Sequence, residues 1–457
     1  MAELRIRTLD GTDTAIPAPA LEGLAARLRG AVLRPGDAGY DEARAVWNAT
    51  IDRRPALVVR CAGAADVIDA VNFARDHGLL LSVRGGGHNI AGTAVCDGGL
   101  MIDLSPLKGI HVDPAAQTVR VQPGAAWGDV DRETQVFGLA VPSGIVSTTG
   151  VAGLTLGGGF GWLTRKHGFT CDSLLSVDIV TADGALRSAS AGENPDLFWG
   201  VRGGGGNFGV VTSFEFRAHP VGPRVVAGMV LHPMERAPEV LGFFRELTAG
   251  APEELHGAPV AAIAVCHAGP IEDGERAVGP LKAFGPPLVD LIGPKPFAAH
   301  QTMLDAAQPP GRHYYWKSEY LPDLGPEAAT VLIDHAGRIT SPQSAVMVMH
   351  LGGAAARVPR DATAAANRDA EYVLNVAGSW LDARESDRHI GWVQGLWRAM
   401  RPLSTGGTYV NFLTGDAEPD RVRAAYGPAT YDRLAALKAR YDPTNLFRLN
   451  QNIRPAG

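Results

Sequence analysis

A run of glycines that ends in a histidine is the segment whose residue types point most directly to chemistry. It reads Ser82-Val-Arg-Gly-Gly-Gly-His-Asn89 and directly follows a short apolar run. Three successive glycines permit a sharp turn whose backbone N–H groups point inward, an arrangement that can hold a pyrophosphate. The residues that follow, Ile90-Ala-Gly-Thr, do not start a helix, so the segment is not the dinucleotide fingerprint G-x-G-x-x-G. The alternatives are a plain turn and, for His88, a packed or solvent-facing side chain.

Two further glycine-rich segments follow along the chain. Pro142 to Gly161 contains small and hydroxyl residues before three successive glycines, and Arg202 to Gly209 contains four successive glycines and a fifth at Gly209. A helix starting near Gly150 could offer free N–H groups to a phosphate. Three such clusters between residues 82 and 209 are more than turns alone require. Together they predict a backbone wrapped around an extended, phosphate-bearing cofactor.

The composition is that of a folded protein with a glycine-rich site. Hydrophobic residues make up 46% of the 457 residues and charged residues 20%, which excludes a disordered chain. The 56 glycines exceed the usual share of roughly 7%. The net charge of −6 provides no basic face for a nucleic-acid backbone, so we expect a small-molecule partner and no nucleic acid. No window approaches the roughly 18 apolar residues of a membrane span, so we expect no membrane partner.

The four cysteines predict neither a metal site nor a disulfide framework. Cys61, Cys96, Cys171 and Cys266 stand far apart, and no pair has C-x-x-C spacing. We therefore expect buried free thiols and no metal. The first residues contain no apolar core like that of a signal peptide, which favours a cytoplasmic protein.

The elements that would position these segments begin with a β-α-β unit. Residues 55–84 read as strand, helix and strand, which predicts α/β architecture there. Short strands bounded by turn residues follow. The glycine motifs stop at the turn-forming cluster His219-Pro-Val-Gly-Pro223. Residues 224–405 are expected to mix strands with helices, including a helix from Asp361 to about Asp382. A last helix is expected from Ala429 to Lys438.

With these motifs in order, the chain resembles the FAD-linked oxidases of the vanillyl-alcohol oxidase superfamily, in the berberine-bridge-enzyme-like branch. The resemblance rests on the motif at Arg84–His88, the long glycine segment, the third cluster and the closing landmarks Tyr409-Val-Asn-Phe and Arg440-Tyr-Asp-Pro-Thr-Asn-Leu-Phe. It implies an α+β protein with α/β elements. Its parts would be an FAD-binding domain (1–220), a substrate domain with an antiparallel sheet (221–408) and a closing segment that returns to the FAD domain (409–457).

The resemblance also implies how FAD is held. His88 matches the histidine that carries the flavin covalently. Members with a second covalent bond have a cysteine where this chain has Val146, so attachment through His88 only is expected, with a tighter site or a smaller substrate. Thr149 matches the residue that controls oxygen access, where valine is found in oxidases; the alternative is a threonine that hydrogen-bonds within its own turn. The expected cofactor residues are Arg84, Gly85, Gly86, Gly87, His88, Asn89, Ser143, Gly144, Thr148, Thr149, Gly150, Gly153, Val180 and Asn411.

The catalytic groups are where the chain departs most from the pattern. Two tyrosines common in the family are replaced by His167 and Phe412, while Tyr409 remains and would share a strand face with Asn411. A histidine titrates near neutrality, so His167 is a candidate base, the alternative being a surface histidine. The candidate substrate residues Lys317, Glu319, Tyr320 and His350 lie on expected wall strands, the alternatives being an ordinary amphipathic strand and a structural histidine.

These features predict an FAD-dependent oxidase. It would transfer a hydride from a C–H bond of an alcohol, an amine or a secondary metabolite to the flavin, and oxygen would be reduced to hydrogen peroxide. The alternatives are a flavin-dependent reductase or dehydrogenase with NAD(P)H or another electron partner, and a flavin-binding protein with little catalysis. The sequence makes no prediction of oligomeric state.

Overall fold

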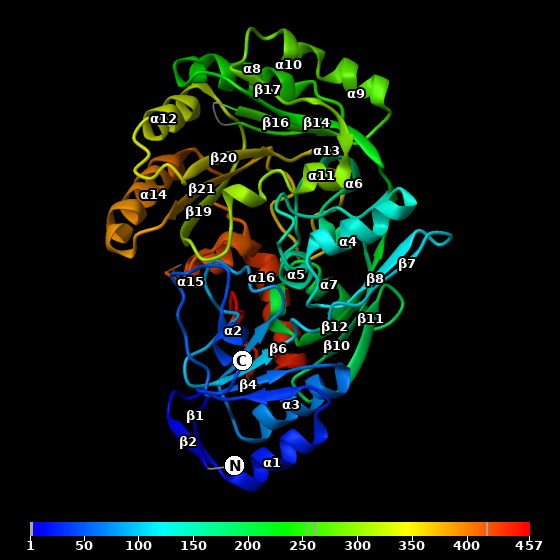
Figure 1. Ribbon diagram of the computed structural model, residues 1–457, viewed down its shortest axis with the longest axis vertical. Coiled ribbons are helices and arrows are strands. Elements are labelled where there is room, and N and C mark those ends of the chain that lie inside the picture. The colour runs from blue at the N-terminus through cyan, green and yellow to red at the C-terminus, as the bar shows by residue number, and fades with distance from the viewer. Residues whose placement is uncertain (1–2, 254, 260–261, 417–418) are drawn as a thin grey trace.

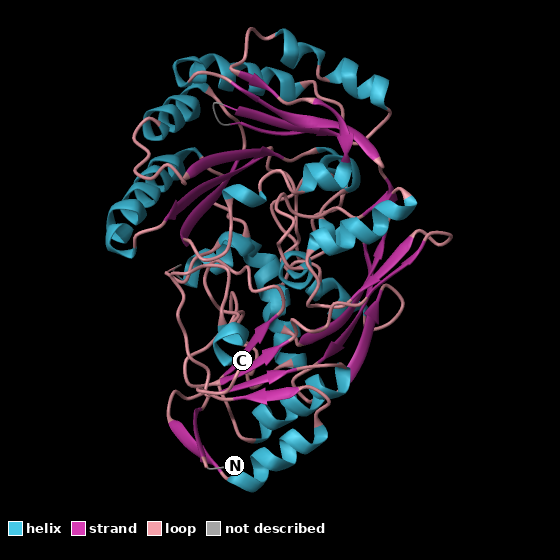
Figure 2. Cartoon of the chain, viewed as in Figure 1, coloured by secondary structure: helices cyan, strands magenta, loops and turns pink. Residues whose placement is uncertain are grey.

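The structure, a computed structural model, describes residues 3–253, 255–259, 262–416 and 419–457. Its elements divide along the long axis of the molecule into an N-terminal half and a half built from residues after 220, with the last two helices beside the N-terminal half (Figure 1). Helices and strands are mixed throughout (Figure 2), which confirms the α+β class.

A four-stranded sheet in the N-terminal half contains the predicted β-α-β unit. Its strands lie in the order β3-β4-β6-β5, with β6 parallel to both β4 and β5. All four residues of β6 are buried, as expected for a parallel strand with both faces covered. Helix α3 buries Val67, Ala70 and Val71 against this sheet. The bounds are β3 (Ala31–Leu33), β4 (Leu57–Arg60), α3 (Ala64–Asp76), β5 (Leu81–Arg84) and β6 (Leu100–Asp103).

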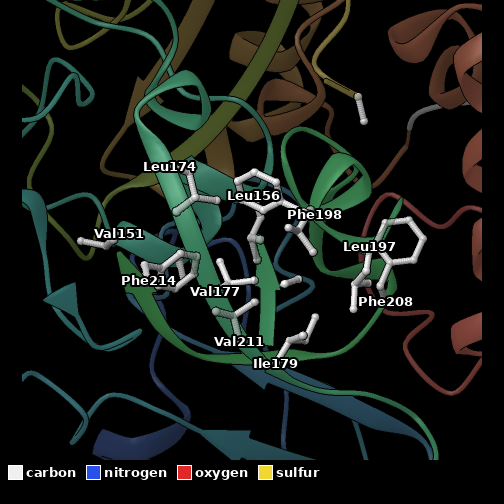
Figure 3. Close-up of a cluster of buried hydrophobic side chains, with 14 of the residues drawn as sticks. Val151, Leu156, Leu174, Val177, Ile179, Leu197, Phe198, Phe208, Val211 and Phe214 are labelled. Carbon is white, nitrogen blue, oxygen red and sulfur yellow. The ribbon is translucent and has the colours of Figure 1, made fainter. Parts of the chain in front are cut away.

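A five-stranded antiparallel sheet, in the order β11-β10-β12-β8-β7, is the second large sheet of the N-terminal half. Its buried face packs against short helices, and Figure 3 shows β10 and β12 contributing Val177 and Phe214 to that core. The bounds are β7 (Ile110–Asp113), β8 (Thr118–Val121), α4 (Trp127–Thr134), α5 (Val151–Leu156), α6 (Thr164–His167), β10 (Leu174–Val180), β11 (Leu186–Ser190), α7 (Pro195–Val201) and β12 (Val210–Arg217).

The second half has two antiparallel sheets with helices on their outer faces (Figure 2). One is ordered β15-β16-β14-β17, with β18 also paired to β14, and the other is ordered β19-β21-β20. The bounds are β14 (Arg224–Leu231), α8 (Ala237–Ala249), β15 (Leu255–Pro259), β16 (Ala262–His267), β17 (Val289–Asp290), β18 (Gly293–Pro296), α11 (Phe297–Gln301), β19 (His313–Leu321), α12 (Pro326–Ala336), β20 (Ala345–His350), β21 (Tyr372–Trp380) and α14 (Ser386–Met400).

The helix expected from Asp361 to about Asp382 is wrong. Residues 361–371 form turns and loop, and the helix is replaced from Tyr372 to Trp380 by β21, the central strand of its sheet, whose nine residues are all buried. A strand buried on both faces reads as a continuous apolar run without the alternation that marks a half-buried strand. The helix was predicted from the apolar periodicity of residues 361–382, which therefore did not indicate the conformation of this segment.

The end of the chain returns to the N-terminal half through α15 (Pro419–Tyr426) and α16 (Pro428–Tyr441). Leu434 and Leu437 of α16 pack in the same core as the antiparallel sheet. The fully buried Lys438 donates to the backbone oxygens of Asn207 and Phe447 and pairs with Asp442. None of the helices within the described residues is long and apolar enough to cross a membrane.

The remaining elements are short. They are β1 (Leu4–Arg7), β2 (Asp13–Ile16), α1 (Ala18–Arg27), α2 (Tyr40–Arg44), β9 (Leu139–Ala140), β13 (His219–Pro220), α9 (Ile271–Ala277), α10 (Gly279–Ala283) and α13 (Gly353–Arg357).

Candidate active site

A cavity of about 270 Å³ lies between the glycine-rich segments of the N-terminal half and the sheet β19-β21-β20. The closing segment and the loop at Gly205–Gly206 complete its walls. No Asp, Glu, Lys or Arg is among the described residues that line it, and its titratable groups are His88, Tyr409 and Tyr426. The cavity is thus apolar and uncharged, with scattered amide and hydroxyl groups.

The first glycine segment forms the floor because its backbone meets the second at close range. A Cβ atom added to Gly86 would lie 2.4 Å from the Cα of Gly150, and one added to Gly150 would lie 2.6 Å from the Cα of Gly86. Gly87 has a φ of +70°, a left-handed conformation that glycine adopts without strain. The two glycine motifs therefore form one surface.

Other glycines keep the cavity free of side chains. Gly153 and Gly206 both line it, and a Cβ at either would meet no protein atom within 4 Å. Side chains there would occupy the cavity itself. The helix expected near Gly150 is present as α5, which begins at Val151. This bare, elongated backbone surface fits an extended nucleotide cofactor.

His88 stands at the end of the glycine turn with its ring held on two sides. Its Nε2 lies 3.0 Å from Thr148 Oγ1, and its ring stacks on Trp47 with centroids 4.8 Å apart. Burial lowers the pKa of His88 to about 4, so the imidazole is neutral at pH 7. A neutral imidazole retains a nucleophilic nitrogen lone pair.

Tyr409 and Asn411 meet at the wall of the cavity. The buried Tyr409 Oη accepts hydrogen bonds from Asn411 Nδ2 at 2.8 Å and from the Gly159 N–H at 3.2 Å. Burial raises the pKa of Tyr409, so it is a phenol at neutral pH. Residues Val410–Phe412 form one turn of 3-10 helix, so the strand expected there is wrong, although the two side chains do adjoin.

Comparison with known proteins identifies the family to which the segments around this cavity belong. The family model described as FAD binding domain matches residues 55–190, and the model described as berberine and berberine like matches residues 408–454. An FAD-linked oxidoreductase of Dictyostelium discoideum is 33% identical, covering 94% of this chain and 95% of the relative. The (R)-6-hydroxynicotine oxidase of Paenarthrobacter nicotinovorans is 32% identical, covering 94% and 98%.

The chain belongs to the berberine-bridge-enzyme-like family of FAD-linked oxidases. The solved structure of 6-hydroxy-D-nicotine oxidase from Arthrobacter nicotinovorans matches with a TM-score of 0.85 at 30% identity, covering 94% of this chain and 98% of that chain. The protein is an FAD-dependent oxidase.

The structure brings most of the expected FAD residues to the cavity. Those that line it are Gly85, Gly86, Gly87, His88, Asn89, Gly144, Thr149, Gly150, Gly153 and Asn411. Thr148 lies behind His88 rather than on the wall.

Three further expected FAD residues do not line the cavity. Side chains alternate along β5, so Leu81 and Val83 face the cavity while Arg84 faces away and donates to the Ala43 carbonyl at 2.6 Å. Ser143 is buried behind its loop, where it accepts from Gln301 Nε2. Val180 packs in the core of the parallel sheet, and its cross-strand partner Val210 lines the cavity instead.

His167 is a correction to the predicted catalytic base. It ends α6 with its ring stacked on His219, centroids 4.1 Å apart, and it does not line the cavity. Burial lowers its pKa to about 3. Its imidazole contacts another histidine ring rather than a substrate, so His167 is not placed to remove a proton there.

The four expected substrate residues are also absent from the cavity wall. Lys317 and Glu319 are on the opposite face of β19, where they pair with Asp416 at 2.9 Å and with Arg421 at 2.7 Å. Tyr320 is on the cavity side of the strand but packs in the core beside Phe160 and Tyr409.

His350, the fourth of these residues, ends β20. Its Nε2 lies 2.9 Å from Arg165 Nη1, away from the cavity, so it fits the structural alternative.

The sheet presents other residues that sequence reasoning missed. They are Trp316 of β19, Met347 and Met349 of β20, and Asn375 of β21. Trp47, which stacks between His88 and Tyr314, was also missed. The aromatic run at residues 314–320 was the available signal for Trp316, while Asn375 fell within the expected helix. Within the described part of the chain there is no cluster of His, Cys, Asp or Glu that could hold a metal.

Proposed function

We propose that FAD is bound covalently through His88 only and that the enzyme oxidises a C–H bond of a small, largely apolar organic molecule. When bound, the flavin accepts a hydride from the substrate, and its reduced form passes the electron pair to oxygen. The observation that carries the proposal is the neutral, clamped imidazole of His88 at the end of the glycine turn.

The geometry at His88 supports one nitrogen over the other. The Nε2 atom is hydrogen-bonded to the Thr148 hydroxyl, which leaves Nδ1 for the bond to the 8α-methyl carbon of the flavin. Formation of this bond would remove one hydrogen from the methyl carbon and one from the imidazole, and oxygen would accept both as hydrogen peroxide. Val146 lines the cavity where a second, cysteinyl bond would require a thiol, and no cysteine is among the described lining residues.

Oxygen as the acceptor is supported by Thr149, which lines the cavity and has nearly the shape of valine. The relatives act on different molecules: one is a hydroxynicotine oxidase, and a 28% identical protein of Thermothelomyces thermophilus is a xylooligosaccharide oxidase. The uncharged wall of Trp316, Met347 and Met349 favours an amine, alcohol or secondary metabolite with apolar surface over a sugar.

The test is the fate of the flavin in acid. Acid-precipitated wild-type protein should stay yellow, and a tryptic peptide containing His88 should carry one FAD mass. His88→Ala should release its flavin, while a matched His77→Ala variant should retain it. Release of all flavin from fully loaded wild-type protein would contradict covalent attachment.

The rival activities have their own readouts. An oxidase should form hydrogen peroxide with a member of a broad substrate panel, whereas a reductase would show rapid anaerobic bleaching by NADPH. A protein that only binds flavin would do neither. A cytoplasmic location remains part of the proposal, since all four cysteines are free and buried, as suits a reducing compartment, and cell fractionation tests it.

A further inference from the structure

Asn375 places a polar side chain in the middle of the apolar wall that faces the flavin site. It is completely buried, it lines the cavity, and it lies at the centre of β21, the central strand of its sheet. Neither its Nδ2 nor its Oδ1 has a hydrogen-bond partner among the described protein groups. One donor group and one acceptor therefore face the cavity together.

The neighbours of Asn375 on the sheet do not hydrogen-bond to this amide. Its cross-strand partner Ser318 shares its hydroxyl with Thr408 Oγ1 at 2.7 Å, and its other partner Met347 has only a thioether. Diagonally across the sheet, Trp316 also lines the cavity, and its indole Nε1 has no partner within the part of the chain that is described. The wall thus carries an amide and an indole N–H on an otherwise apolar surface.

A buried amide without a partner destabilises a folded protein, and a central strand position would accept leucine or valine without this cost. The amide at position 375 is therefore best explained by a ligand group that pairs with it. Because an amide has both a donor and an acceptor, its best complement offers both on adjacent atoms.

The charge of the ligand follows from the rest of the lining. No carboxylate, ammonium or guanidinium is among the described lining residues. The nearest charged side chains on β19, Lys317 and Glu319, are on the far face of the sheet and are already paired. At the wall formed by the sheet β19-β21-β20, a charged ligand group would lose its hydration without gaining a counter-ion, which is strongly unfavourable.

We propose that Asn375 is the substrate-anchoring residue, and that the substrate is an uncharged, planar ring compound bearing an amide-like edge with adjacent donor and acceptor. The edge pairs with the Asn375 amide, while Trp316, Met347 and Met349 cover the ring. This inference rests on the proposed function, because it assigns the sheet to substrate and the glycine segments to flavin.

Binding of small probes to the flavin-loaded enzyme tests this, with the flavin absorbance spectrum as the readout. Benzamide has the proposed edge, acetophenone has the same shape without the donor, benzoate is an anion, benzamidinium is a cation and cellobiose is a sugar. Wild-type enzyme should bind benzamide about 10- to 100-fold more tightly than acetophenone, and the other three more weakly still.

Two variants isolate the amide. Asn375→Leu should remove the preference for benzamide over acetophenone while retaining binding of acetophenone. Asn375→Asp, nearly identical in shape, should reverse the preference from benzamide to benzamidinium, because its carboxylate accepts from both amidinium N–H groups. The matched control is Lys317→Met on the far face of β19, which should leave all five affinities unchanged.

Several results would overturn the proposal. These are an unchanged benzamide preference in Asn375→Leu, failure of wild-type enzyme to bind benzamide, and tighter binding of benzoate or cellobiose than of benzamide. Loss of flavin from either variant would assign Asn375 to the cofactor instead. If acid releases the wild-type flavin, covalent attachment fails, but probe binding can still be measured on the non-covalently loaded enzyme, so the two proposals fail separately.

Discussion

At the scale of single residues, the structure leaves Tyr409 as the titratable group best placed to take a substrate proton. We propose that His88 binds the flavin, and His167 lies outside the cavity. Tyr426 also lines it, but no described group donates a hydrogen bond to its oxygen. The N–H donors of Asn411 and Gly159 both point at the Tyr409 oxygen, so they stabilise the phenolate that forms when Tyr409 loses its own proton.

Tyr409→Phe should therefore slow flavin reduction by substrate roughly 10²- to 10⁴-fold while leaving flavin content unchanged. Because the pKa of Tyr409 is raised, the wild-type reductive rate should keep rising into alkaline solution rather than level off above ~6.5 as it would with an imidazole base. Anaerobic stopped-flow measurement across pH checks both. His167→Ala is the control: a large loss of rate in that variant would restore the imidazole base.

At the scale of elements, the glycine segments differ in what a side chain would disturb. A Cβ at Gly86 would meet the backbone of Gly150, whereas a Cβ at Gly153 would meet no protein atom. Gly86→Ala should separate the two segments and lower both the melting temperature and the flavin content. Gly153→Ala should leave the melting temperature of the flavin-free protein unchanged and weaken FAD loading alone. Thermal unfolding with and without FAD distinguishes the two, and equal behaviour would contradict the assignment of Gly153 to the cavity.

The elements also differ in whether the sequence alone could predict them. The glycine turn with His88 and the β-α-β unit are specified locally, by residues adjacent in the chain, so both could be predicted. The wall could not. Side chains of β19 point alternately to its two faces, and the last four residues are buried on both faces. Because both faces are covered, the sequence alone does not tell whether the face of Trp316 or that of Lys317 lines the cavity. Helix α14 decides this by covering the side that carries Glu319, whose carboxylate accepts from Trp397 Nε1.

At the scale of the whole molecule, the second half hydrogen-bonds to the loop at residues 143–147, which lies at the cavity. Gln301 of α11 donates to Ser143 Oγ and to the Gly144 carbonyl, and Asp305 accepts from the N–H and hydroxyl of Ser147. These bonds join the two halves directly behind the cavity. None of them could be read from sequence, because their partners lie 157 or 158 residues apart.

Asp131 of α4 lies completely buried at this junction. Burial raises the pKa of Asp131 to about 8, and the nearby Gln301 amide opposes the rise only in part. In the unfolded chain this carboxyl ionises near pH 4, while in the folded protein it stays protonated until about pH 8. The unfolded state therefore binds fewer protons between these values, and the contribution of Asp131 to the free energy of unfolding falls as pH rises through this window.

Asp131→Asn removes this titration and keeps the shape of the side chain. The variant should match the wild type near pH 4 and become more stable than it as pH rises, by up to roughly 1.4 kcal/mol for each pH unit until about pH 8. Denaturant unfolding of both proteins at several pH values measures the difference, and Glu133→Gln, an exposed carboxyl on the same helix, should show no such trend. A stability difference independent of pH would mean that Asp131 is ionised in the folded protein. The junction would then contain a buried charge, and its partner would have to come from α11 or the loop at Ser143–Ser147.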